Sequence, residues 1–498
     1  MDAVNTEEDG GGRVRKLGER IAERIVAEIV EQGWPVGRNL GTEKELLQKY
    51  GIARATFREA IRQVERHGAA NMRRGAGGGL IVSDRPRAAA IRAMMTFFEL
   101  THVSFADQHE TREQLEVAAA RLAAERASED DIAHLRALVD DLRRVDDVTT
   151  NVQANMRVRV AVAEATGNPT LGLFIDALNG VMREILRVLR SSQDSFQRDR
   201  ELSADFKQNL VEAIAERNAD RAERLVRGDM RRRLLAMTSA IARPVPPDAT
   251  IDYSERLPAW WAEGEGGQLK LADQIVSHMV ADVARLGWKQ GHNLGREADL
   301  QVRYGVSRAV LREAIRQLEL HGIAQMRTGL QGGLVIGKIS PTYTVELVST
   351  YLKSTHLEIR HLWETESYLH VFAAGRIAQI GDARDHAALQ ASMAELRTAT
   401  PQTYLELAHS LHRLIADRTG NRALSLFIRV LTQCAIPFLP KVDPRNLPYM
   451  IDVHERLVAA ICQQEPKAAE AIMTELYGRA RAWMGAEHAP RRRRTSPS

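Results

Sequence analysis

A stretch of sixteen residues occurs twice in this chain of 498 residues. Residues 53–68 read ARATFREAIRQVERHG and residues 307–322 read SRAVLREAIRQLELHG, with Arg54 and Arg308 254 residues apart. In each copy, apolar residues three or four positions apart indicate a helix with one buried face. Arginines recur at every fourth residue beside that face, and a packed helix of this kind is suited to contact with a polyanion. The alternative is a solvated surface helix that is rich in arginine.

Length and charge narrow the class of protein. The chain is too long for a single core and predicts three or four domains. Its formal net charge is only +4, so the basicity that matters is local, and an aromatic content of 5% argues against binding single strands by base stacking. No apolar run approaches the roughly 18 residues of a membrane helix, and the acidic start MDAVNTEEDGGG does not resemble a signal peptide. The two cysteines, Cys434 and Cys462, form no CxxC motif, which favours buried thiols in a reducing cytoplasm.

The segment around the first arginine helix has a recognisable order. Apolar residues four apart predict a helix over residues 16–32, and Thr42 with Glu45 forms a capping-box motif that starts a second, short helix. The arginine helix follows a tight turn and ends at Gly68. Two short strands around the glycine cluster at 75–79 complete the segment. This order predicts a winged helix-turn-helix.

The stretch GTEKELLQKYGIARATFREAIRQVERHG, followed by RRGAGGGLIV, resembles the DNA-binding domain of GntR-type regulators. The resemblance covers about residues 14–83 and implies that Arg54 and Arg58 read the major groove, that Lys44 assists, and that the glycine-rich wing reaches the minor groove. Ala53 departs from the family, which usually has a serine that caps the recognition helix. The first set of expected DNA-binding residues is Lys44, Arg54, Thr56, Arg58, Arg62, Arg74 and Gly77.

A second winged helix-turn-helix is expected over residues 268–337. Here Ser307 can cap the recognition helix, but Ala298 stands where the first copy has Lys44, so one basic contact is missing. The second set of expected DNA-binding residues is Arg296, Ser307, Arg308, Arg312, Arg316, Arg327 and Gly332.

The remaining segments predict a mainly α protein. Residues 86–241 and 345–485 have patterns of about six or seven helices each. They resemble the FCD effector domain of the FadR subfamily, on an R-x-x-L-E motif at Arg112 and an ATGNP turn at 165–169. We expect Arg360 and Glu364 to repeat Arg112 and Glu116. A disordered tail (1–13), a proline-rich linker (242–267) and a basic disordered tail (486–498) complete the expected organisation.

The resemblance also implies where a metal would lie, because many FCD domains bind a divalent metal through an aspartate and three histidines. In the first half those positions hold Asn155, Arg159, Lys207 and Asp229, and two of these are cationic. In the second half they hold Ala408, His412, His454 and Leu476. We therefore expect no metal and no other cofactor.

A small anionic effector, such as an organic acid, is the ligand that the resemblance implies. Arginine binds a carboxylate through two parallel hydrogen bonds, although Arg112 and Arg360 could instead form intrahelical pairs with the glutamates that follow them. The expected effector-binding residues are Arg112, Arg159, Lys207, Arg360, His412 and His454.

The sequence as a whole favours a regulator of transcription that is expected to act as a repressor on double-stranded DNA. We expect one chain to supply both winged helix-turn-helix domains, here called its two heads, as an intrachain pseudo-dimer. A homodimer with four heads is the rival assembly. An architectural protein that bridges DNA without sensing a ligand is the alternative function. An enzyme is not expected, since the chain has no nucleophile elbow, P-loop or HExxH motif, and no catalytic residue is assigned.

Overall fold

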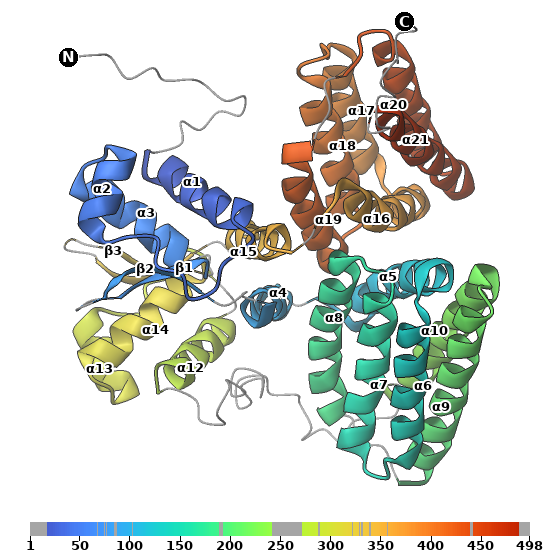
Figure 1. The fold of residues 1–498 in the computed structure, drawn as a ribbon, viewed down its shortest axis with the longest axis horizontal. Helices are drawn as coiled ribbons and strands as arrows, with labels where there is room; N and C mark the ends of the chain where they lie inside the picture. The colour runs from blue at the N-terminus through green and yellow to red at the C-terminus, as the bar shows by residue number, and fades with distance from the viewer. Residues whose placement is uncertain are drawn as a thin grey trace, which may run out of the picture. The chain divides into compact units, whose positions relative to one another are not determined.

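The computed structural model describes residues 17–241 and 271–487, apart from short stretches at 67, 74, 76, 84–86, 102, 189–192, 287–288, 321, 328, 330–331, 338–339, 356 and 439–441. Helices predominate in this part of the chain, and its strands form two separate two-stranded sheets (Figure 1). The expected mainly α fold class is confirmed, with winged domains and helical domains alternating along the sequence. The expected N-terminal tail and linker lie outside the described residues, as does the basic tail from residue 488 onward.

The first winged domain has three helices and a hairpin: α1 (Leu17–Glu31), α2 (Glu43–Tyr50), α3 (Arg54–Arg66), β1 (Ala70–Arg73) and β2 (Gly79–Val82). As predicted, Thr42 caps α2 by accepting a hydrogen bond from the amide of Glu45, whose carboxylate accepts one from the amide of Thr42. Gly51 then ends α2 in the left-handed conformation, at φ 62°. That turn separates α2 from α3 and sets the angle at which α3 crosses the domain.

The core of this domain lies where α1 crosses α3 beneath the hairpin. Ile25 and Ile29 of α1 and Phe57 and Val64 of α3 are all buried there. Burial of one side of α3 fixes the rotation of the helix, and its opposite side is therefore turned outward.

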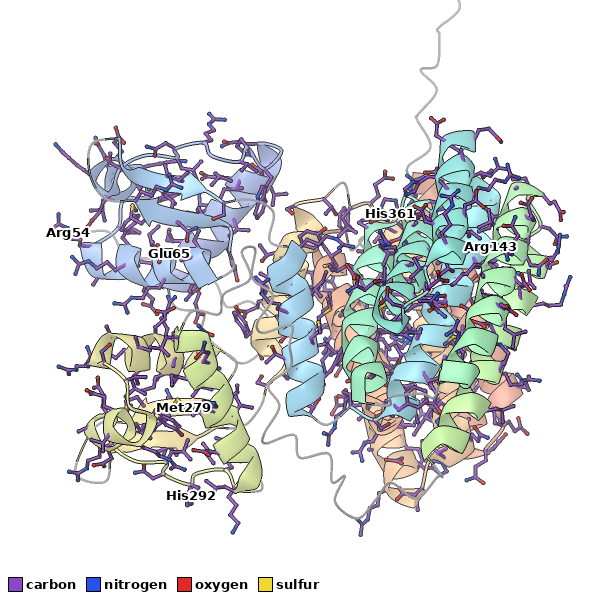
Figure 2. The ribbon with its side chains drawn as sticks, turned by 90° about the horizontal axis from the view of Figure 1, so that it is seen from below. Arg54, Glu65, Arg143, Met279, His292 and His361 are labelled. Atoms are coloured by element: carbon purple, nitrogen blue, oxygen red, sulfur yellow. The ribbon has the colours of Figure 1, made fainter. Side chains whose placement is uncertain are left out.

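The second winged domain repeats this arrangement with α12 (Leu271–Arg285), α13 (Glu297–Tyr304), α14 (Arg308–Leu320), β3 (Ala324–Arg327) and β4 (Gly333–Ile336). Its core includes Met279, which lies inside the domain (Figure 2). The predicted cap is present, because the hydroxyl of Ser307 accepts a hydrogen bond from the amide of Val310 at 3.4 Å. Ala53, its equivalent in the first copy, has no side-chain oxygen to do the same.

The first helical domain is built around α5, which is buried along most of its length. The ATGNP segment forms the turn between α7 and α8, with Gly167 at φ 68°. Ser128 and Asp131 form the predicted cap of α6. The helices of this half are α4 (Arg87–Leu100), α5 (Phe105–Arg126), α6 (Glu129–Arg144), α7 (Val148–Glu164), α8 (Pro169–Val188), α9 (Gln193–Ala215) and α10 (Ala219–Ile241).

The second helical domain has the same order around α16, and Gly420 makes the equivalent turn at φ 73°. Its helices are α15 (Thr342–Lys353), α16 (Ile359–Ile380), α17 (Ala383–Arg397), α18 (Tyr404–Arg418), α19 (Arg422–Ala435), the 3-10 turn η1 (Ile436–Phe438), α20 (Leu447–Cys462) and α21 (Pro466–Glu487).

The two helical domains contact each other through equivalent parts of the repeat. The Nδ2 of Asn421 donates to the carbonyl of Asp107, and the Nδ2 of Asn168 donates to the carbonyl of His361, both at 2.9 Å. Asp107 and His361 are 254 residues apart, and Asn168 and Asn421 are 253 apart. The two bonds are therefore copies of each other, and the domains are related by an approximate two-fold axis.

Aromatic rings close the centre of this contact. Phe174 of α8 and Phe427 of α19 are equivalent residues, and their rings stack with centroids 4.1 Å apart and planes 7° from parallel. Phe98 of α4 meets Phe427 edge-on at 5.6 Å. Arg126 of α5 reaches across the contact to the carboxylate of Glu364 on α16, at 2.5 Å. The contact thus combines a buried aromatic centre with polar bonds around it.

Candidate nucleic-acid interface and buried polar clusters

In each copy, the arginines at every fourth residue form a row, here called the arginine ladder. Both ladders lie on the exposed side of a helix whose other side is buried. In α3 the exposed residues are Arg54, Arg58 and Arg62, and in α14 they are Arg308, Arg312 and Arg316. The Arg54 side chain extends outward from its domain (Figure 2). Neither ladder is covered by the rest of its own domain, so each can approach a large partner such as duplex DNA.

The other expected DNA-binding residues vary in exposure. Thr56 is half-buried, Gly332 is buried, and Arg74 lies outside the described residues. The remaining ones are exposed: Lys44, Gly77, Arg296, Ser307 and Arg327.

Glutamate carboxylates form ion pairs with several arginines of α3 and α14. The sequence analysis did not predict these pairs. The Nε of Arg54 lies 2.9 Å from Glu43 Oε1. In the second domain Glu297 Oε1 accepts from the Nε of both Arg308 (2.9 Å) and Arg312 (2.8 Å). Hydrogen bonds from Arg312 and Arg308 lower the pKa of Glu297. The signal was present in the sequence, because each glutamate is the first residue of the helix before the ladder.

The wings are fastened by an asparagine that the sequence reasoning also missed. Asn39 donates to the carbonyl of Gly78 at 3.2 Å and accepts from the amide of Gly41 at 2.9 Å. Asn293 makes the same bonds to Gly332 and Gly295 in the second copy. A Cβ on Gly79 would come within 2.3 Å of Asn39 Oδ1, so this glycine is required by close packing.

A cluster of charged side chains lies buried inside the first helical domain. The three expected effector-binding residues of this half, Arg112, Arg159 and Lys207, are 6%, 6% and 1% exposed. Arg159 donates to both carboxylate oxygens of Glu116, and its Nη2 lies 3.5 Å from Asp229 Oδ2. The structure therefore brings helices α5, α7, α9 and α10 together around one set of charges.

Burial and mutual repulsion govern ionisation in this cluster. Burial, followed by the neighbouring Arg159, lowers the pKa of Lys207 well below its usual value. Burial also lowers the pKa of Arg112 to about 10. For Asp229, burial acts to raise the pKa, but Arg233, Arg159 and Lys207 together hold it well below its usual value. The cluster is an electropositive interior in which the carboxylates stay ionised.

The corresponding interior of the second helical domain carries histidines in place of those cations. His412 Nε2 and His454 Nε2 are 3.1 Å apart, and His454 Nδ1 lies 2.7 Å from the carbonyl of Met450. The His370 ring lies 5.0 Å from that of His412. Burial lowers the pKa of His370 to about 3 and that of His454 to about 4, and it raises the pKa of Glu366 to about 8. The interior is therefore uncharged at neutral pH.

Our expectation that Arg360 and Glu364 repeat Arg112 and Glu116 is wrong. The paired hydrogen bonds of the domain contact show that equivalent residues of α5 and α16 are 254 positions apart. Glu366 and His370 are therefore the equivalents of Arg112 and Glu116. The Arg360 side chain is 60% exposed and pairs with Glu358 at 3.0 Å. The error arose because an R-x-x-x-E spacing occurs by chance at Arg360, six residues before the position equivalent to Arg112. Arg112 itself lies 3.8 Å from Glu116, the intrahelical pair that was the alternative.

No group of three or more potential metal ligands is close enough to hold an ion among the described residues. We expect the purified protein to retain well under one equivalent of zinc or nickel per chain, because Ala408 and Leu476 stand at two of the four family positions. Metal analysis after gel filtration measures this. A stoichiometric metal that resists chelators and disappears in His412→Ala and His454→Ala would contradict it. In the part of the chain that the structure describes, no helix is long and apolar enough to cross a membrane.

Comparisons with known proteins match both parts of the repeat. The family described as bacterial regulatory proteins, gntR family, matches residues 17–79 and 271–332, and the FCD domain matches residues 107–232 and 361–479. These four segments cover most of the chain and account for both winged domains and both helical domains.

Individual relatives align with about one half of the chain. An HTH-type transcriptional regulator named RmpR from Mycobacterium gastri is 27% identical over 248 residues, which are 47% of this chain and 87% of that protein. The HTH-type transcriptional repressor NanR of Salmonella newport (strain SL254) is 26% identical over 217 residues, 42% of this chain and 81% of that protein. Among solved structures, a Streptococcus agalactiae GntR aligns with 43% of this chain and 99% of its own, at 19% identity and a TM-score of 0.36.

Proposed function

Because the chain belongs to the GntR family of bacterial regulatory proteins and is a DNA-binding regulator of transcription rather than an enzyme, we propose that it is a repressor whose two heads bind one operator. We further propose that a small effector in the helical domains modulates this binding. The observation that carries the proposal is the pair of exposed arginine ladders, each on a helix fixed by a buried core.

In the proposed complex α3 and α14 lie in successive major grooves, where Arg54 and Arg308 contact bases at the start of each helix. Arg58, Arg62, Arg312 and Arg316 contact bases or phosphates farther along, and the wings approach the minor groove. Glu43 and Glu297 hold Arg54 and Arg308 extended before DNA arrives, which lowers the entropy lost on binding. The similarity to a relative named as a repressor supports repression as the mode of action.

The effector part of the proposal rests on the helical interiors. Arg112, Arg159 and Lys207 are the candidate contacts for an anion in the first domain. His412 and His454 are the candidate contacts in the second domain, where an uncharged molecule is a better match for the neutral surroundings. A ligand that changes the packing of α5 or α16 acts on the contact between the two domains, because both helices contribute to it.

We also propose that one chain supplies both heads as a pseudo-dimer. The equivalent hydrogen bonds around Asn168 and Asn421 and the stacked Phe174 and Phe427 join the two halves of a single chain. Single-unit relatives need two chains to present two heads to a two-fold operator. Joining the units in one chain also raises their effective concentration to around millimolar, which favours pairing within the chain.

We expect the operator to be an imperfect palindrome. The first head has Lys44, and the second head lacks its counterpart. In the second head Glu297 binds both Arg308 and Arg312, whereas in the first head Glu43 pairs with Arg54. Selection from a random duplex library should therefore return one half-site that tolerates more base changes. A symmetric consensus would contradict this expectation.

The same selected duplex tests the assembly and the effector. Native mass spectrometry should show one chain per operator; a dominant two-chain complex at nanomolar protein would refute the pseudo-dimer. Ligand-dependent release from that operator would support the repressor with an effector, and binding that no small molecule alters would favour an architectural protein.

A further inference from the structure

The two arginine ladders differ in how many carboxylates neutralise them. In the second head, Glu297 Oε1 accepts hydrogen bonds from the Nε atoms of Arg308 and Arg312, at 2.9 and 2.8 Å. The third arginine, Arg316, pairs with Glu313 at 3.1 Å. Every arginine of this ladder is therefore engaged by a carboxylate of its own domain.

The ladder of the first head has fewer such pairs. Arg54 pairs with Glu43 at 2.9 Å, but no carboxylate of a described residue lies within ion-pair distance of Arg58 or Arg62. Lys44 adds a further exposed cation, and its equivalent in the second head is an alanine. The first head therefore presents four cations beside one carboxylate, whereas the second presents three cations beside two carboxylates.

One substitution on the first helix of each head explains part of this difference. In the first head Glu59, the equivalent of Glu313, lies so close to Gly18 of α1 that a Cβ there would come within 3.1 Å of its Cγ and Cδ. The equivalent of Gly18 in the second head is Ala272, which is buried and carries that Cβ. Because its methyl group takes the space that Glu59 uses, Glu313 turns toward Arg316 instead.

A carboxylate beside an arginine competes with a DNA phosphate for the same guanidinium. Non-specific binding depends on phosphate contacts, so it is weakened wherever carboxylates of the protein already engage the arginines. Base contacts at a correct half-site add hydrogen bonds that a scrambled sequence does not provide. Pairing within the protein therefore lowers non-specific affinity more than specific affinity. Hydrogen bonds from Arg312 and Arg308 also lower the pKa of Glu297, which keeps this carboxylate charged at neutral pH.

We propose that Glu297 and Glu313 are specificity-determining residues, which suppress binding of the second head to DNA that lacks its half-site. The first head, whose arginines are less neutralised, supplies the phosphate contacts that hold the chain on DNA of any sequence. The second head then adds affinity only at the operator. This division between the heads rests on the proposed function, in which both heads bind one operator.

Glu297→Gln in the full chain tests the proposal, because glutamine keeps the shape of the side chain but removes its charge. Affinity for a scrambled duplex at low salt should rise by about 3- to 10-fold, as expected when two exposed ion pairs are released. The slope of log affinity against log salt concentration should steepen by about 0.9, the value for one further phosphate. Affinity for the selected operator should rise less, because the carboxylate that orients Arg308 is lost, so the ratio of operator to scrambled affinity should fall. Fluorescence anisotropy titrations over a range of salt concentrations measure these quantities.

Three further variants identify the cause of the change. Glu313→Gln should act in the same direction by about 2-fold, since it releases one arginine. Glu43→Gln should raise affinity for the scrambled duplex by less than Glu297→Gln does, because other cations of the first head are available in either case. Glu455→Gln is the matched control. Glu455 lies on α20 of the second helical domain and pairs with Arg397 at 2.6 Å, so this variant removes the same charge outside both heads.

Unchanged affinity for the scrambled duplex in Glu297→Gln would overturn the inference, as would an equal rise in Glu455→Gln or in Glu43→Gln. Misfolding cannot mimic the expected result, because it would lower DNA affinity rather than raise it. The measurements on the scrambled duplex need neither an operator nor an effector. A two-chain complex on the operator would therefore refute the pseudo-dimer of the proposed function and leave this assignment to be decided by the scrambled duplex alone.

Discussion

Arg54→Ala and Arg308→Ala should each weaken binding to the selected operator by about 1–3 kcal/mol, which is roughly 5- to 150-fold in affinity. Each arginine is the first residue of its recognition helix, is exposed, and is held by a glutamate from the preceding helix. Alanine removes the two-pronged donor that distinguishes guanine from other bases, so specificity should relax at one position of the corresponding half-site. Gel-shift titrations on operator and scrambled duplexes at fixed salt measure both effects.

Arg143→Ala is the matched control for those variants. Arg143 lies on α6 of the first helical domain, is exposed, and pairs with Asp205 at 2.8 Å (Figure 2). The substitution removes the same charge from the chain without touching either head, so operator affinity should stay close to that of the unaltered protein. Equal losses in Arg54→Ala and Arg143→Ala would show that net charge, rather than base contact, governs binding.

Phe427→Ala should lower the free energy of unfolding of the helical domains by about 3–5 kcal/mol. The ring is fully buried, stacks on Phe174 and meets Phe98 edge-on. Its removal leaves a cavity at the contact between two close-packed domains, and neither side can collapse into the space without losing other contacts. Urea unfolding followed by helical circular dichroism measures the shift of the transition midpoint.

Two further variants show whether the loss arises from the contact between domains. Phe438→Ala is the control, because this phenylalanine is 39% exposed in η1 and should matter little. The double variant Phe174→Ala, Phe427→Ala should differ from the sum of the single losses by about 0.5–1.5 kcal/mol, since stacked rings interact directly. Strict additivity would mean that the two rings do not touch in solution and would weaken the case for the pseudo-dimer.

The proposed separation of DNA contact from effector binding follows from how each kind of residue is held. The arginines of α3 and α14 stay exposed because burial of Phe57 and Leu311 fixes the opposite side of each helix. The polar groups of α5 and α7 are buried because the helical domain closes around them. In the proposed function, a ligand in the helical interiors would act on the heads through the packing of the helical domains. The contact around Asn168 and Asn421 is the part of that packing shared by both copies.

Local patterns in the sequence were sufficient for much of this fold. The Thr42 capping box, the Ser307 cap, the Ser128 cap and the turn before α8 depend on residues within a few positions of one another, and all are present. The arginine ladders were also predictable, because helical periodicity separates their exposed side from the buried one.

Contacts between distant residues were decided by the tertiary structure. Only the paired hydrogen bonds of the domain contact show that Glu366 and His370 are the equivalents of Arg112 and Glu116. The sequence alone misled, because an R-x-x-x-E spacing lies six residues earlier on the same helix. The buried charges of Arg159, Glu116 and Lys207 meet only because helices from separate parts of the chain close on one another. The sequence by itself determined which segments are helices and which sides they bury, because those properties follow from short-range spacing. Only the packing of the helices decided which buried polar groups meet, because that depends on the rotation and depth of each helix in the core.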